Sequence, residues 1–88
     1  MKLKDFILIT RDDWPEVEQC ILEFGDYYLS IIRFKASGIF EIEFEKSGHI
    51  KNPFNDTCTG TIYNVSEEQI NNYILLLTLL TGSHPTQV

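Results

Sequence analysis

The fold of this chain is indicated most clearly by one alternating stretch, Ile39-Phe40-Glu41-Ile42-Glu43-Phe44-Glu45. Apolar and acidic residues alternate in it with a period of two, which is typical of a β-strand with one buried face. Because residues two apart on a strand point the same way, Glu41, Glu43 and Glu45 are expected to share one face. We call these three residues the glutamate ladder. Like charges in a row repel one another unless a cation lies opposite, so the ladder is a candidate contact surface.

A neighbouring strand is predicted over residues 27–35, where apolar side chains occupy both alternating faces. A short loop around Gly38 would join this strand to the acidic one as a β-hairpin. Such a hairpin sets Arg33 and Lys35 near the glutamate ladder if the register aligns their faces. Otherwise the compensating charge has to come from a partner molecule.

Residues 14–24 are predicted to form an amphipathic helix, since apolar side chains recur in them at helical spacing: Val17, Cys20, Ile21 and Phe24. Asp13 is placed to cap the start of this helix, and Gly25 is placed to end it.

A second helix is predicted over residues 67–81. Ser66 and Gln69 form a capping box at its start, and Gly82 followed by Pro85 provides a stop. One side of this helix is expected to face the core, with the members Ile70, Tyr73, Ile74, Leu77 and Leu80.

Two further strands are predicted over residues 6–10 and 59–65, and residues 50–57 are expected to form an irregular connection. The predicted architecture is therefore α+β, in the order β-α-β-β-β-α, with two helices packed on a four-stranded mixed or antiparallel sheet. Residues 1–82 are expected to form a single domain, and residues 83–88 a C-terminal tail.

The composition is acidic, and this limits the classes of molecule that the chain is expected to bind. Among 88 residues, 13 acids stand against seven Lys and Arg, which gives a net charge of −6. Such a field repels nucleic acids and acidic membrane surfaces and attracts basic proteins. The apolar runs are too short for a signal peptide or a membrane span, so a cytoplasmic location is expected.

Residues that carry chemistry are few. Cys20 and Cys58 lie far apart without metal-binding or redox spacing and are expected to be buried thiols. The histidines are His49 and His84, and no zinc, calcium or nucleotide motif occurs. We therefore expect no enzyme, no metal and no cofactor. A small enzyme that uses His49 and Cys58 is a distant third hypothesis.

The surface acids point instead to a basic protein partner. In size and charge the chain is similar to the small acidic immunity proteins of contact-dependent-inhibition and colicin systems. We therefore interpret it as a bacterial, non-enzymatic inhibitor that neutralises a basic nuclease-type toxin with its carboxylates. The expected partner-binding residues are the glutamate ladder with Asp12, Asp13, Trp14, Glu16 and Glu18.

A second hypothesis concerns the last helix. Leu75 and Leu79 form an apolar pair on roughly the opposite side from the predicted core face. Another element of the fold, a second copy of the chain or a partner has to cover them. If a second copy covers them, the chain is a structural or accessory interaction module that homodimerises through these leucines or through an exposed edge strand. In that alternative the surface acids bind no partner and serve only solubility.

Overall fold

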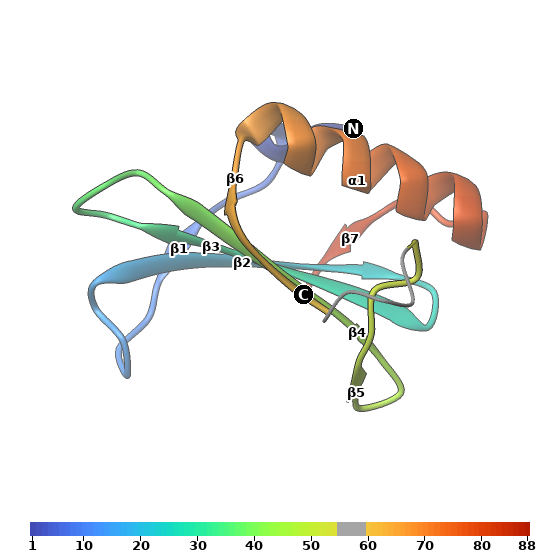
Figure 1. Cartoon of the computed structure of the whole chain (residues 1–88), viewed down its shortest axis with the longest axis horizontal. Helices are drawn as coiled ribbons and strands as arrows, with labels where there is room; N and C mark the ends of the chain where they lie inside the picture. The colour runs from blue at the N-terminus through green and yellow to red at the C-terminus, as the bar shows by residue number, and fades with distance from the viewer. Residues whose placement is uncertain (55–59) are drawn as a thin grey trace.

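The computed structural model describes residues 1–54 and 60–88, which form a seven-stranded antiparallel sheet with one α-helix across it (Figure 1). A short 3-10 helix, η1, spans Leu3–Asp5. The remaining elements are β1 (Ile9–Thr10), β2 (Val17–Phe24), β3 (Tyr27–Phe34), β4 (Phe40–Lys46), β5 (His49–Ile50), β6 (Thr61–Val65), α1 (Glu67–Thr81) and β7 (Thr86–Gln87). The fold is mostly β, so the prediction of an α+β fold with four strands and two helices is wrong.

The strands are ordered β1-β2-β3-β4-β5. The strand β6 pairs with the same edge of β4 as β5 does, and β7 shares the outer edge of β2 with β1. The residues expected to be a tail, 83–88, include β7, which pairs with β2 through Leu22 and Glu23. Gln87 also bonds to the segment before β1, because its side-chain oxygen accepts from the Ile7 amide at 3.0 Å. Residues 7–10 and the C-terminal strand β7 therefore lie along the same edge of the sheet.

The predicted helix over residues 14–24 is instead the strand β2, and this is the main error of the sequence interpretation. Cys20, Leu22 and Phe24 are buried in the core, whereas the residues between them are only partly buried. This alternation is the strand period, which the helical spacing of Val17, Cys20, Ile21 and Phe24 had masked because it left Leu22 out. Gly25, at φ +58, starts the two-residue loop that joins β2 to β3. The hydrogen bonds that β2 makes with its neighbouring strands on both edges override the helical pattern of its own sequence.

The last helix is confirmed, since α1 spans Glu67–Thr81 as predicted. The Ser66 hydroxyl accepts from the Gln69 amide, the Gln69 side chain accepts from the Ser66 amide, and Gly82 ends the helix in the left-handed conformation. Ile70, Ile74 and Leu77 are buried against the sheet. Leu80, which was expected in the core, is 52% exposed.

The hairpin of β3 and β4 is confirmed, and β6 at Thr61–Val65 lies within the predicted strand over residues 59–65. The strand predicted over residues 6–10 is reduced to β1 at Ile9–Thr10. The core lies in the layer between α1 and one face of the sheet, and its sheet residues include Leu22, Leu29, Ile42 and Phe44.

Candidate protein-binding face

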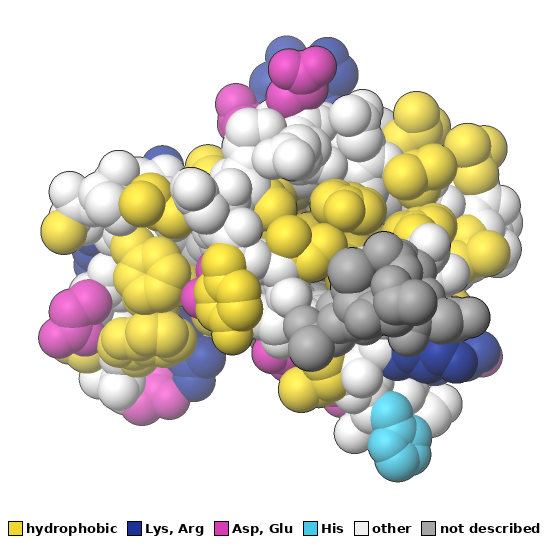
Figure 2. All heavy atoms as spheres, viewed as in Figure 1, with side chains coloured by type: hydrophobic (Ala, Val, Ile, Leu, Met, Phe, Trp, Pro, Cys, Tyr) yellow, Lys and Arg dark blue, Asp and Glu magenta, His cyan; other side chains and the backbone are white. Residues whose placement is uncertain are grey.

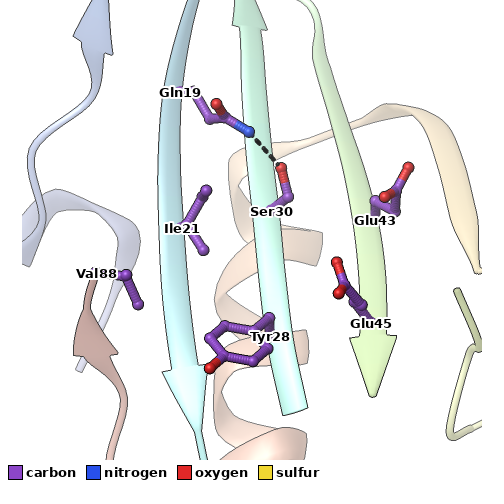
Figure 3. A pocket seen from close by; sticks show the side chains of 7 residues that line it. All are labelled: Gln19, Ile21, Tyr28, Ser30, Glu43, Glu45 and Val88. Atoms are coloured by element: carbon purple, nitrogen blue, oxygen red, sulfur yellow. Dashed lines mark hydrogen bonds between the residues drawn. The ribbon is translucent and has the colours of Figure 1, made fainter. Parts of the chain in front are cut away.

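One face of the sheet packs against α1, and no described element covers the other (Figures 1 and 3). We call this second side the open face. Strand registers place on it one row of side chains from each of four strands. The members are Val17, Gln19, Ile21 and Glu23 of β2, Tyr28, Ser30, Ile32 and Phe34 of β3, Glu41, Glu43 and Glu45 of β4, and Thr61 and Tyr63 of β6.

The glutamate ladder lies on the open face, as the alternation predicts, but its expected cations do not lie opposite it. On β3 its direct neighbours are uncharged, because Ile32 pairs with Glu41, Ser30 with Glu43 and Tyr28 with Glu45. Arg33 pairs instead with Phe40, whose side chain points to the core side. The register therefore does not align Arg33 with the ladder, so of the two alternatives the one with Arg33 opposite the ladder does not hold.

Arg33 and Lys35 have other positions. The Arg33 guanidinium donates to the Glu18 carboxylate, its neighbour across β2 and β3, and the pair lies on the same side of the sheet as α1. Lys35 follows the end of β3, where its amide donates to the Glu16 carbonyl at 3.0 Å. In the part of the chain that the structure describes, neither ion pair includes a ladder carboxylate.

The ladder is partly desolvated and self-repelling. All three of its glutamates are half-buried. Burial, reinforced by the negative charge of Glu43, raises the pKa of the Glu41 carboxyl. Glu43 accepts a hydrogen bond from the Thr61 hydroxyl at 3.3 Å. A cation placed over this row would relieve a repulsion that the isolated chain leaves in place.

A hollow of about 340 Å³ lies beside the ladder on the open face (Figure 3). Its polar floor is fixed from within the chain. Gln19 Nε2 donates to Ser30 Oγ at 2.8 Å, and Gln19 Oε1 accepts from Arg11 Nη1 at 2.9 Å. The other residues lining the hollow are Ile21, Tyr28, Glu43, Glu45 and Val88.

The sequence interpretation missed Gln19, Tyr28, Ser30 and Val88 as members of one site. The dipeptide Gly25-Asp26 between two eight-residue stretches rich in apolar side chains was the available signal, because it is typical of a two-residue hairpin loop. Reading β2 as a strand would have placed these side chains next to the ladder.

The remaining predicted contact residues are dispersed. Asp12, Asp13 and Glu16 are exposed in the connection between β1 and β2. Asp13 is held by Arg11, whose Nε lies 2.9 Å from Asp13 Oδ1, and this hydrogen bond lowers the pKa of Asp13. Glu18 is engaged by Arg33 on the opposite side from the ladder. The structure therefore brings together only the ladder, out of the acids proposed from sequence.

Trp14 adds an apolar contact at one end of the open face. Its ring meets that of Phe34 edge-on, with 5.8 Å between the ring centroids. Val17, the partner of Phe34 across the strands, is fully buried. Trp14 itself remains 38% exposed. Exposed Trp and Tyr side chains are common anchors of protein interfaces, and Tyr63 on β6 is another.

The outer side of α1 is a second, apolar surface. Leu75 and Leu79 are 56% and 71% exposed, and Leu76 and Leu80 are also exposed. We call these four residues the leucine face. Figure 2 shows hydrophobic side chains gathered over the C-terminal end of α1. No described element of the chain covers them.

Chemical sites are not evident in the described ranges. Residues 1–54 and 60–88 contain no group of three or more His, Cys, Asp and Glu placed to hold a metal ion. Cys20 is buried, as predicted, and burial raises its thiol pKa to about 11. His49 is exposed on β5, whereas Cys58 lies outside the described residues. Across those same ranges, no helix has the length and apolarity that crossing a bilayer requires.

Comparison with known proteins gives no relative for this chain. No protein-family model, no curated protein and no solved structure matches it. Any function must therefore be inferred from its own surfaces.

Proposed function

We propose that this chain is a small non-enzymatic inhibitor that binds a basic protein through its open face. The partner we expect is a nuclease-type toxin with a cationic groove, which would make the chain a bacterial immunity protein acting in the cytoplasm. The supporting observation is the glutamate ladder: three half-buried carboxylates on an uncovered sheet face, with uncharged partners on β3. A basic groove would supply the missing positive charge and would be steered to this face by the net charge of −6.

The geometry also provides contacts that are not electrostatic. Trp14 lies exposed at one end of the open face, and Tyr63 stands beside Glu41 on β6 with 70% of its surface exposed. Aromatic anchors next to charged groups are the usual source of affinity in protein interfaces, whereas the charges set the association rate and the choice of partner. A nuclease active site offers both a cationic groove and apolar walls for such anchors.

The test compares two variants with the same net charge. The ladder variant carries Glu41→Gln, Glu43→Gln and Glu45→Gln. The control carries Asp26→Asn, Glu67→Gln and Glu68→Gln, which neutralise acids in the β2–β3 loop and at the start of α1. Wild type, control and ladder variant are used as bait in extracts of the native source at low and at high salt, and the captured proteins are identified.

The proposal expects one basic protein that wild type and control retain at low salt and that the ladder variant loses. That protein, once purified, should show nuclease or other toxic activity that one equivalent of this chain abolishes. Capture of the same proteins by control and ladder variant would refute the role of the open face. A captured partner that stays fully active when saturated would refute inhibition.

The leucine face favours a second candidate, a structural or accessory module that homodimerises through α1. From Ile70 to Thr81 the helix carries no charged residue, so two copies could meet there without repulsion between like charges. Exposed apolar patches of this kind commonly mark protein contacts.

Sedimentation velocity over a range of concentrations tests the module. A variant with Leu75→Ser and Leu79→Ser is compared with one carrying Ile7→Ser and Ile9→Ser, which removes two exposed apolar side chains elsewhere. Self-association lost only in the leucine variant supports the module. A wild-type monomer at all concentrations refutes it.

A further inference from the structure

The hollow on the open face has walls of three different kinds. The carboxylates of Glu43 and Glu45 lie on β4, the Tyr28 ring lies on β3, and the aliphatic side chains of Ile21 and Val88 lie opposite (Figure 3). A volume of about 340 Å³ is at the small end of ligand pockets. The hollow therefore suits a single long side chain and not a helix or a strand.

We propose that this hollow receives an arginine side chain of the basic partner, an inference that rests on the proposed function. A guanidinium has five N–H donors and no acceptor, so its site has to offer acceptors. Glu43 and Glu45 offer carboxylate oxygens from neighbouring positions on the same side of β4. Their negative charge complements the cation on a sheet face that no described element covers.

The polar groups around the hollow leave these carboxylates as its principal acceptors. The Gln19 amide is already engaged, with its oxygen bound to Arg11 and its nitrogen to Ser30. Glu43 accepts from Thr61 through Oε2, and among the described residues no other hydrogen bond or ion pair engages its second oxygen. Within residues 1–54 and 60–88, the Glu45 carboxylate takes part in no ion pair. An anion entering here would meet two carboxylates, so phosphates and acidic side chains are excluded by charge.

The walls favour arginine over lysine. The planar guanidinium can stack on an aromatic ring and bind a carboxylate with two parallel hydrogen bonds, neither of which an ammonium group can do. Tyr28 pairs directly with Glu45 across β3 and β4, which places a ring and a carboxylate at neighbouring positions. The methylene stem of arginine would then pack against Ile21 and Val88.

The test uses three defined probes: acetyl-Gly-Arg-Gly-amide and its matched peptides with lysine or with the neutral isostere citrulline. Each is titrated into the isotopically labelled full chain at low ionic strength and followed by NMR. We expect saturable shifts at Ile21, Tyr28 and Val88 with the arginine peptide, several-fold weaker binding of the lysine peptide, and no saturable binding of the citrulline peptide.

Two double variants localise the effect. Glu43→Gln with Glu45→Gln is expected to weaken arginine binding about tenfold or more, because both charge-assisted acceptors are lost. Glu67→Gln with Glu68→Gln removes the same charge at the start of α1 and is expected to change the affinity by less than about twofold. Both variants keep the side-chain shape, and their spectra report whether they remain folded.

Three results would overturn the inference: citrulline binding as well as arginine, equal weakening in both double variants, or shifts that avoid the hollow. The inhibitor proposal is tested separately by the capture experiment. A chain whose hollow ignores arginine, but whose ladder variant loses its basic partner, keeps the inhibitor function without this subsite.

Discussion

The relative stability of two alanine variants distinguishes the strand β2 from a helix over the same residues. In the strand, Leu22 faces the core with no exposed surface, and Ile21 points to the open face and lines the hollow. In the predicted helix, Ile21 belonged to the buried stripe and Leu22 did not. Replacing each by alanine removes three carbons in both cases, so the two variants differ mainly in where those carbons lie.

The expected costs follow from burial. Three buried carbons at about 0.8 kcal/mol each give about 2.4 kcal/mol for Leu22→Ala. Truncating Leu22 also leaves a cavity between its strand neighbour Leu29 and α1, which raises the expected loss of stability to about 3–4 kcal/mol. Ile21→Ala removes partly exposed carbons and only enlarges an open hollow, so we expect a cost of about 1–1.5 kcal/mol.

Urea denaturation followed by the fluorescence of Trp14, the single tryptophan, measures both values. The edge-on contact of Trp14 with Phe34 is lost on unfolding, which provides the fluorescence change. With a urea slope of about 1 kcal/mol per molar, the two midpoints should differ by about 2 M. An Ile21→Ala variant as destabilised as Leu22→Ala would refute the strand assignment and, with it, the open face.

Three further outcomes are expected. In a Cys58→Ser background, Cys20 should react with a thiol reagent only as fast as the chain unfolds, since burial raises its pKa to about 11; rapid labelling of the native protein would contradict its burial. Burial raises the pKa of the Glu41 carboxyl in the folded state, so its ionisation lowers the free energy of unfolding as pH rises through that pKa. The Glu41→Gln variant should therefore be at least as stable as wild type near pH 7, and it should lose less stability between about pH 4 and pH 7. A Glu41→Gln variant less stable than wild type near pH 7 would contradict this reasoning. Gly60→Ala should lower the free energy of unfolding by about 1–3 kcal/mol, because the added Cβ would lie 2.7 Å from the Lys51 backbone nitrogen, and an unchanged urea midpoint would contradict this close approach.

The elements predicted correctly from the sequence are those with local determinants. The helix α1 has its cap at Ser66, its stop at Gly82 and its apolar spacing within 17 consecutive residues, so nothing distant is needed to define it. The acidic strand β4 is likewise defined by its own alternation. Its side-chain faces followed directly from the sequence because a strand has only two of them.

The strand β2 could not be recognised in the same way, since its apolar residues satisfy both periods. Cys20 and Phe24 are buried in either interpretation, and only Leu22 and Ile21 distinguish them. Pairing with β3 on one side and with β1 and β7 on the other decides the outcome. The partners in β7 lie more than 60 residues away in sequence, at Thr86 and Gln87, so no local window contains this information.

The candidate site likewise has one part that is determined locally and one part that depends on distant strand pairing. The glutamate ladder is a property of one strand and was predicted, whereas the hollow depends on the registers of three strands and on Val88. The position of Arg33 was also a matter of register: a shift of one residue would have moved it to the ladder side. With the observed register, Arg33 neutralises Glu18 beside the core layer and leaves the ladder to the outside.

This division of charge explains why the open face stays open. A sheet packed on one side by a helix can accept a second layer only where its other face is apolar. Here the strand β4 places Glu41, Glu43 and Glu45 on that face, and a layer from the same chain would have to bury three like charges without a counterion. The apolar residues at its end, Trp14 and Phe34, pack on each other instead. The charges of this face therefore disfavour the chain's own apolar elements and a second copy of the same acidic face, and this is why we propose a partner surface that brings positive charge.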